Sequence, residues 1–255
     1  MTVIDFGASR HLARLWFVMI DLAQIQLSDA VVLGSHLRTL AHGAGSIEAA
    51  ARRLVDHLYD ELRRGDERAC ALVRFYKTHP YADLDPDLAG VAARCLAGPP
   101  PPESSCLVLM ATRGDRPAWN DRRASIGHRA IPLPDAAFIE RLPMVAEIFR
   151  QFGISPAAFI ERDEAALREL ERSGSTIFLV EEANGSSFIP AQDFVKDAGV
   201  RSVLAFGGIL PYAQLFVVLL FSRLPVTRRA ADLLKPLALN VKLALLPLCR
   251  MRAFD

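Results

Sequence analysis

Two apolar runs near the C-terminus constrain the fold of this chain more than any other feature. They lie in VRSVLAFGGILPYAQLFVVLLFSR, residues 200–223, on either side of the break LPYA, and both are rich in residues that favour strands. A short turn between two such runs is typical of an antiparallel hairpin. The second run, residues 214–222, is far shorter than the roughly 20 residues of a membrane-spanning helix. We therefore predict a buried antiparallel hairpin and no membrane insertion.

A glycine doublet, Gly207 and Gly208, lies inside the first of these runs. It matches neither of the glycine-rich loops that bind nucleotide phosphates, GxGxxG and GxxxxGKS/T. A glycine inside a strand often marks a bulge or a place where another group approaches the backbone closely. We predict one of these two roles for the doublet.

The remaining elements follow from the spacing of apolar residues. Further strands are expected at residues 70–77, 105–112 and 175–182, where strand-forming runs are bounded by turn residues. Helices are expected where apolar residues recur every three or four positions. These helical segments are residues 8–41 with a break near Ser28, 46–63, 86–97, 135–153, 155–174 and 227–246. A hairpin with helices grouped at the ends predicts an α+β domain with an antiparallel sheet, rather than alternating βαβ units.

Capping residues mark several of the helix ends. Ser46 and Asp135 are suited to N-caps because a side-chain oxygen there can accept a backbone N–H of the first turn. Gly153 is suited to a C-terminal stop. Pro143 is expected to kink the helix that contains it, because proline has no backbone N–H to donate.

The composition excludes several classes of function. The 255 residues contain 30 Lys and Arg against 29 Asp and Glu, so we expect no charged surface for nucleic acid or an anionic membrane. The four cysteines include no CxxC pair, and their spacing signals neither a zinc site nor a disulfide framework. No apolar run at the start is followed by a small-residue cleavage site. We therefore expect a cytoplasmic protein with reduced thiols and no nucleic-acid partner.

Several of these segments together resemble a GAF domain. The RSVLAF strand, the LFVVLLFS strand and the helix TRRAADLLKPLALNVKLALL resemble the C-terminal half of that family, and helix 46–63 with the strand ACALVRFYK resembles its opening. The middle, with THPYADL, GDRPAWNDRRASIGHRAIPL and FIPAQDFV, looks like GAF-like input domains that precede kinase modules in bacterial sensor histidine kinases. We accordingly predict an N-terminal helical extension, residues 1–43, and a GAF-like domain, residues 44–250.

The resemblance implies an antiparallel sheet with terminal helices on one face, often used for dimerisation, and a ligand pocket on the other. It implies a sensory or regulatory module that binds a small ligand and relays occupancy through its terminal helices to a signalling partner. It names no ligand or cofactor, since family members accommodate cyclic nucleotides, haem, bilins, small metabolites or nothing. A ligand-free dimerisation module with the same fold is the alternative. We expect a homodimer because the segments 8–41 and 227–246 both carry broad apolar stripes.

A polar segment, ATRGDRPAWNDRRASIGHRAIPLP, residues 111–134, interrupts the apolar pattern. Loops held by a rigid sheet commonly carry binding groups. The predicted ligand contacts in it are Trp119 as a stacking surface, Arg122 and Arg123 as anion clamps, and Asn120 and Asp121 as hydrogen-bond partners. In the structural alternative the acidic residues of the segment pair with its arginines, and the indole covers the edge of the core.

Three further residues are candidates for the same pocket. His128 lies in the polar segment, while Lys77 and His79 end the first strand, where a solvated turn is the alternative. His128 could ligate haem, but it has no second ligand at helical or hairpin spacing, so we predict no metal. Cys106, His128 and Asp121 have the residue types of a nucleophilic triad, but Cys106 opens an apolar strand, where a buried and inert thiol is usual. We therefore predict that the chain is not an enzyme and assign no catalytic residue.

Overall fold

A six-stranded antiparallel sheet lies at the centre of the molecule. The computed structural model describes residues 19–96, 98–125, 128–167 and 176–255. The order of the strands in the sheet is β6-β5-β4-β9-β8-β7, with every neighbouring pair antiparallel. These strands are β4 (Cys70–Pro80), β5 (Ser105–Gly114), β6 (Ala130–Leu133), β7 (Thr176–Val180), β8 (Ser202–Leu210) and β9 (Gln214–Ser222). The predicted hairpin is confirmed as β8 and β9.

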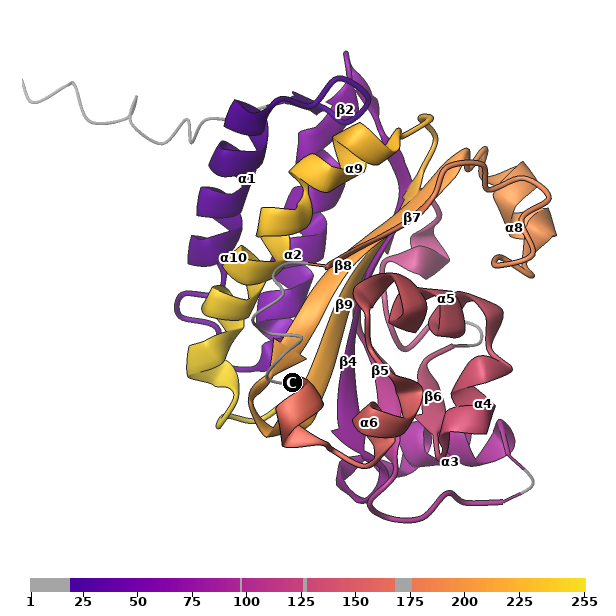
Figure 1. Cartoon of the computed structure of the whole chain (residues 1–255). Helices are drawn as coiled ribbons and strands as arrows, with labels where there is room; N and C mark the ends of the chain where they lie inside the picture. The colour runs from indigo at the N-terminus through magenta and orange to yellow at the C-terminus, as the bar shows by residue number, and fades with distance from the viewer. Residues whose placement is uncertain (1–18, 97, 126–127, 168–175) are drawn as a thin grey trace, which may run out of the picture.

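Helices cover both faces of this sheet (Figure 1). On one side, which we call the terminal-helix face, lie α1 (Leu27–Leu40), α2 (Ile47–Glu61), α9 (Arg228–Leu233) and α10 (Lys235–Leu245). On the other side, the middle-helix face, lie α4 (Ala136–Glu140), α5 (Pro143–Phe152), α6 (Pro156–Ile160) and α8 (Gln192–Asp197). This is the arrangement that the GAF resemblance implied, and the chain has a GAF-like α+β fold.

Smaller elements complete the structure. Helix α3 (Pro86–Arg94) packs beside β6, and a three-stranded sheet is formed by β1 (Ile20–Asp21), β2 (Leu62–Arg64) and β3 (Glu67–Arg68). Single 3-10 turns lie at Tyr81–Asp83, Pro117–Trp119, Pro211–Ala213 and Leu246–Leu248. None of the described helices is long and apolar enough to cross a membrane.

Each face of the sheet has its own hydrophobic core, because side chains alternate across a strand. On the terminal-helix face, Leu54 of α2 and Val241 of α10 pack with Phe75 of β4. On the middle-helix face, Phe149 and Phe152 of α5 pack with strand residues that include Leu109 and Leu219. Burial on both faces explains why the strands are almost continuously apolar in sequence.

Several predicted helix ends are confirmed by their caps. The Ser46 hydroxyl accepts the Ala49 N–H at 2.9 Å, and the Asp135 carboxylate accepts the Phe138 N–H at 2.7 Å. Gly153 ends α5 with a left-handed φ of 71°.

The predicted helix over residues 8–41 is only partly correct. Its first part, residues 8–18, lies outside the described residues, and residues 19–26 are not helical. Here the Asp21 carboxylate accepts the Ala23 N–H at 2.9 Å, a local bond that competes with helix formation. The helix begins at Leu27, where the Asp29 carboxylate accepts the Gln26 N–H at 2.9 Å.

Two other segments predicted as helical each divide into two helices, because proline begins a new helix in each. The segment 135–153 divides into α4 and α5, with Pro143 at the start of α5, a position that needs no N–H. In the same way Pro236 lies in the first turn of α10, which separates it from α9. In the segment 155–174, α6 ends at Ile160, and residues 168–175 lie outside the described residues.

Candidate functional site

The structure places the predicted ligand contacts in several different environments. Trp119 follows β5 and is half-buried at the edge of the middle-helix core. Its ring centroid lies 5.5 Å from that of Phe194 in α8, and the Arg116 guanidinium lies 4.8 Å from the indole. The indole therefore covers the end of this core, and it is on the face where a GAF-like ligand pocket was expected.

Asn120, Asp121 and Arg123 order the segment in which they lie. The side-chain oxygen of Asn120 accepts the Gly114 N–H at 2.9 Å, and the Asp121 carboxylate accepts the Arg123 N–H at 2.8 Å. Asn120, Asp121 and Arg123 are all exposed. These contacts are local turn contacts of the kind that the structural alternative anticipated.

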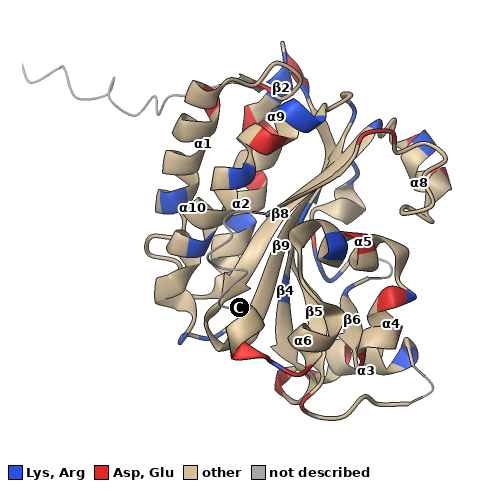
Figure 2. Ribbon diagram, viewed as in Figure 1, with Lys and Arg blue, Asp and Glu red and all other residues tan. Residues whose placement is uncertain are grey.

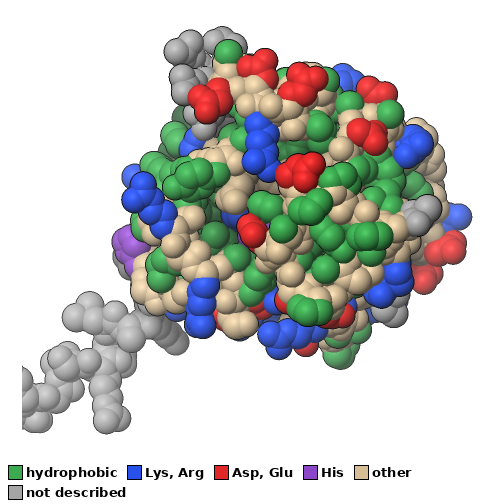
Figure 3. Space-filling model, turned by 90° about the horizontal axis from the view of Figure 1, so that it is seen from below, with side chains coloured by type: hydrophobic (Ala, Val, Ile, Leu, Met, Phe, Trp, Pro, Cys, Tyr) green, Lys and Arg blue, Asp and Glu red, His purple; other side chains and the backbone are tan. Residues whose placement is uncertain are grey.

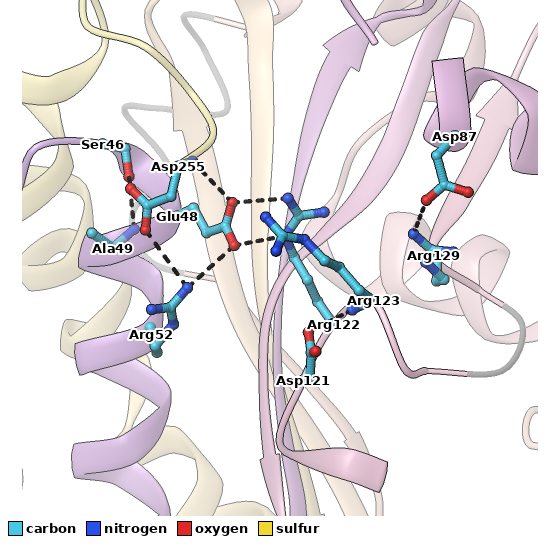
Figure 4. Close-up of polar contacts among 10 residues, drawn as sticks. All are labelled: Ser46, Glu48, Ala49, Arg52, Asp87, Asp121, Arg122, Arg123, Arg129 and Asp255. Carbon is cyan, nitrogen blue, oxygen red and sulfur yellow. Dashed lines mark hydrogen bonds and ion pairs between the residues drawn. The ribbon is translucent and has the colours of Figure 1, made fainter. Parts of the chain in front are cut away.

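Arg122 is committed to a buried ion pair with Glu48 at the start of α2 (Figure 4). The Nε of Arg122 lies 2.8 Å from Oε1 of Glu48, and its Nη2 donates to Oε2 at 2.9 Å. The two residues are only 7% and 3% exposed. An external anion would have to displace Glu48 to reach this guanidinium, so the structure supports a structural role for Arg122.

The C-terminal residues join the same network. The Ala253 carbonyl accepts the Glu48 N–H at 2.9 Å, and the Arg252 carbonyl accepts the Ile47 N–H at 3.4 Å. These bonds satisfy two of the first N–H groups of α2, which have no partner within the helix. The Glu48 carboxylate accepts the Asp255 N–H at 3.2 Å (Figure 4). The Arg122 guanidinium lies 5.1 Å from the centroid of the Phe254 ring. Residues 252–255 therefore tie the polar segment to α2.

Lys77 and His79 lie on the terminal-helix face, so the structure does not bring them together with Trp119. Lys77 is paired across the sheet with Phe216, and His79 with Cys106, both in the terminal-helix core. The His79 ring centroid lies 5.2 Å from that of Phe254. Alternation along β4 gives this placement, because Lys77 and His79 lie two and four positions after Phe75, which belongs to the terminal-helix core.

Burial shifts the pKa of both groups. It lowers the pKa of Lys77 from 10.5 to about 8, and burial together with the charge of Lys77 lowers the pKa of His79 to about 3. Lys77 is 1% exposed and its ammonium donates to the Thr78 carbonyl at 3.1 Å. Burial of the charged ammonium of Lys77 therefore lowers the free energy of unfolding.

We expect Lys77→Met to raise the free energy of unfolding at pH 7 by about 1 to 3 kcal/mol, because it removes a buried charge and keeps an unbranched apolar chain. In the original protein the unfolded chain binds more protons than the folded chain between pH 8 and 10.5, so stability should rise with pH across that window. The variant should lack this rise. Urea unfolding of both proteins at pH 7 and pH 10 measures the difference, and an equal rise in both would contradict the assignment.

The strands themselves hold a cluster that the sequence analysis missed. Within the six strands of the central sheet, as far as they are described, the only Lys, Arg, Asp or Glu residues are Arg74, Lys77 and Arg113. Arg113 pairs with Asp56 of α2 at 3.5 Å, so it faces the terminal helices, as Lys77 does. Figure 2 shows how sparse charge is along the sheet. Arg74 is thus the one charged side chain that these strands present to the middle-helix face.

The position of Arg74 follows from the register of the sheet. Residues directly opposite in neighbouring strands point to the same face. Arg74 is opposite Thr112 in β5 and opposite Leu219 in β9, and Leu219 belongs to the middle-helix core. The Arg74 guanidinium donates from Nη1 to the Tyr76 hydroxyl at 3.2 Å and from Nη2 to the Ser125 hydroxyl at 3.0 Å. We call these residues the Arg74 cluster: Arg74, Tyr76, Thr112 and Ser125.

Two polar atoms of the Arg74 cluster are buried without a partner. Nε of Arg74 and Oγ1 of Thr112 make no hydrogen bond within the described residues, and Thr112 is 5% exposed. No described carboxylate pairs with Arg74, whose polar contacts are the two neutral hydroxyls. A buried unpaired donor costs about 1 to 3 kcal/mol. The sequence signal was an arginine in the middle of the apolar strand CALVRFYK, with a threonine near the end of SCLVLMAT.

Of the remaining candidates, His128 lies near the Arg74 cluster, because desolvation and, after it, the charge of Arg74 lower the pKa of its imidazole. His128 is exposed and has a left-handed φ of 52°. Cys106 is buried in the terminal-helix core, and burial raises the pKa of its thiol to about 12, which leaves little thiolate. No contact joins Cys106, His128 and Asp121 in the described ranges. In the same ranges no three His, Cys, Asp or Glu residues are grouped so that they could hold a metal ion.

A hollow lies at the open edge of the sheet, apart from the Arg74 cluster. It has a volume of about 550 Å³ and is lined by residues of α5, β7 and the following loop, including Glu147, Glu181 and Phe188. Gln151 of α5 accepts the Leu179 N–H at 2.9 Å and donates to the Leu179 carbonyl at 3.2 Å. These two bonds occupy backbone groups at the edge of β7, which limits addition of another strand there.

Comparison with known proteins shows likeness only at the level of structure. No family model matches the sequence, and no curated protein matches it. Free methionine-R-sulfoxide reductase from Neisseria meningitidis, in complex with its substrate, is similar at 12% identity and a TM-score of 0.48, covering 92% of this chain and 98% of that chain. The GAF domain of a phosphoenolpyruvate-protein phosphotransferase from Coxiella burnetii is similar at 11% identity and a TM-score of 0.45. The match covers 86% of this chain and 92% of that chain. Likeness of this degree carries no substrate or activity to this chain.

The same comparison corrects one prediction. We expected that the chain is not an enzyme. The similar structures include not only the Neisseria enzyme but also fRMsr of Staphylococcus aureus with its substrate, at 10% identity and a TM-score of 0.43, covering 85% of this chain and 95% of that chain. A GAF-like fold therefore gives no ground for excluding catalysis, and the exclusion drawn from the sequence was wrong.

Proposed function

We propose that this chain is a regulatory module that binds a small ligand on the middle-helix face of its sheet and relays occupancy to a signalling partner. The observation that carries this proposal is the pair of buried, unpaired polar atoms on that face, Nε of Arg74 and Oγ1 of Thr112. A bound ligand would supply the missing hydrogen bonds and remove the cost of leaving them unmade. Trp119 is retained as a ligand contact, because its ring borders the same core.

The relay that we propose runs through the polar segment. Ser125 of this segment contacts Arg74, and Arg122 of the same segment reaches Glu48 at the start of α2. A ligand that takes over the contact of Ser125 would therefore bias the position of a segment anchored on a terminal helix. Binding shifts the output only if it favours one of two arrangements of these elements.

The terminal helices also carry the surface that we assign to a homodimer. Helices α1 and α10 lie side by side (Figure 1). Their exposed apolar residues are Leu27, 62% exposed, and Val31, 63%, on α1, with Leu239, 54%, and Leu243, 41%, on α10. Leu246 and Met251, which follow α10, are 38% and 48% exposed. Figure 3, which views the molecule from below, shows hydrophobic side chains among charged ones on the underside. A second copy packed on these helices would bury these exposed apolar side chains.

Mass spectrometry of compounds released by heat from freshly purified protein tests the ligand. We expect one small molecule in stoichiometric amount, and we expect Thr112→Val, which keeps the shape but removes the hydroxyl, to retain much less of it. Thr39→Val on the exposed face of α1 is the matched control and should retain as much as the original protein. Absence of any released compound would argue for the ligand-free dimerisation module instead, and equal retention by Thr112→Val would show that the compound does not bind at the Arg74 cluster.

A further inference from the structure

We infer that the ligand of the Arg74 cluster is an organic acid whose carboxylate pairs with the Arg74 guanidinium. This inference rests on the proposed function and specifies the chemistry of the same site. It concerns Arg74, Thr112 and Ser125, none of which was singled out by the sequence analysis. It also separates this arginine from Arg122, whose carboxylate partner is already within the protein.

The positive charge of Arg74 favours a ligand that carries a negative group. Arg74 is half-buried, and an arginine keeps its positive charge under all ordinary conditions. An opposite charge offsets the cost of removing a charge from water better than neutral hydroxyls do. Arg113 has Asp56 and Arg122 has Glu48, but among the described residues no carboxylate pairs with Arg74. The missing counter-charge is therefore assigned to the ligand.

The free donors of the cluster fit two oxygens in one plane. A guanidinium has five N–H groups, and two of those of Arg74 are used, one by Tyr76 and one by Ser125. Nε–H remains free, and each terminal nitrogen has a second N–H. Two parallel N–H groups of arginine bind the two oxygens of a carboxylate, and the Thr112 hydroxyl adjoins them on the same face of the sheet.

The number of charges favours a carboxylate over a phosphate. One guanidinium neutralises one negative charge, which is the charge of a carboxylate. A phosphate monoester carries close to two at neutral pH. The strand residues around the cluster are apolar, with Leu219 directly opposite Arg74 and Leu72 two positions before it. The remainder of the ligand is therefore expected to be apolar.

The free atoms are closed to solvent in this structure. Nε of Arg74 and Oγ1 of Thr112 are both buried, and Ser125 is 6% exposed. An incoming carboxylate must therefore displace part of the cover over Arg74. Since Ser125 is a direct partner of the guanidinium, displacement of its hydroxyl would give the ligand room and would also move the polar segment.

Titration calorimetry with matched pairs of small probes tests the inference. The probes are benzoate and hexanoate, their amides benzamide and hexanamide, and inorganic phosphate, all at one ionic strength. We expect each carboxylate to bind at least 10-fold more tightly than its amide and more tightly than phosphate. Arg74→Met should weaken carboxylate binding at least 10-fold, and Arg74→Lys, which keeps the charge but loses the fork of donors, should weaken it less. Arg201→Met removes an exposed arginine and should leave binding unchanged.

The outcomes separate this inference from the proposed function. Equal binding of acid and amide, tighter binding of phosphate, or unchanged binding in folded Arg74→Met or Arg74→Lys overturns the carboxylate assignment. If no probe binds, the compound released by heat decides: a carboxylic acid lost from the Arg74 variants supports the inference, and a neutral compound lost from Thr112→Val overturns it while the proposed function stands. If no probe binds and no compound is released, both fail.

Discussion

We expect Gly207→Ala to lower the free energy of unfolding by more than about 3 kcal/mol. A Cβ built at Gly207 would lie 2.2 Å from the Phe216 carbonyl oxygen and 2.9 Å from the Phe152 ring. The first contact involves the backbone of the paired strand β9, so neither side can yield without loss of pairing. Gly208→Ala is the matched control, because its Cβ would meet the Phe216 ring only at 3.5 Å, an ordinary contact.

Chemical unfolding of the two glycine variants makes the comparison. Gly208→Ala should change stability by less than about 1 kcal/mol, since it adds one methyl group to a strand without overlap. Equal stability of the two variants would show that the approach of α5 and β9 to Gly207 is looser than the structure indicates. The close approach of Phe216 and Phe152 to Gly207 confirms one of the two roles predicted for the glycine doublet, a place where another group approaches the backbone.

The second large effect is expected at the Glu48–Arg122 pair. Loss of one partner leaves the other charge buried, which typically costs about 3 to 5 kcal/mol. We therefore expect Arg122→Met to destabilise the protein by that amount, and Glu48→Met to do so as well. The double variant should recover much of the loss, because replacing a whole buried pair by apolar residues is often nearly neutral.

This double-variant cycle also decides the role of Arg122. If Arg122 serves the fold, Arg122→Met lowers stability and leaves binding of the released compound unchanged in the folded fraction. Arg52→Met is a suitable control, since Arg52 also contacts Glu48, at 3.3 Å, but its side chain is 59% exposed and a surface pair contributes about 1 kcal/mol or less. Loss of ligand binding in Arg122→Met without loss of stability would restore its predicted role as an anion clamp.

Local signals in the sequence were enough for much of the fold. The hairpin at residues 200–223 and the helix capped by Ser46 depend on alternation, turn residues and capping, which act within a few positions. The short strand β6 was missed because Ala130–Leu133 contains a proline, which a strand tolerates at the edge of a sheet. Helix α8 was missed because its six residues are too few to show a helical period.

The candidate site was harder to predict because it depends on pairing between distant segments. The polar segment was identified, but its Arg122 is paired with a glutamate 74 positions earlier in the chain. Arg74 was visible as a charged residue in an apolar strand, yet its face of the sheet is set by the register with β5 and β9. Lys77 lies three positions after Arg74, so alternation along β4 places it on the other face. The Glu48 partner of Arg122 and the hydroxyl partner of Arg74 at Ser125 lie far away in the chain, so spacing within one segment does not predict them.

An experimental structure of the freshly purified protein, at a resolution that shows bound small molecules, tests the central claim most directly. The claim is that Nε of Arg74 and Oγ1 of Thr112 lack partners because a ligand provides them. We predict electron density for a small molecule within hydrogen-bonding distance of both atoms. A structure in which Arg74 pairs with a carboxylate of the protein, and Thr112 bonds within the chain, would contradict the claim.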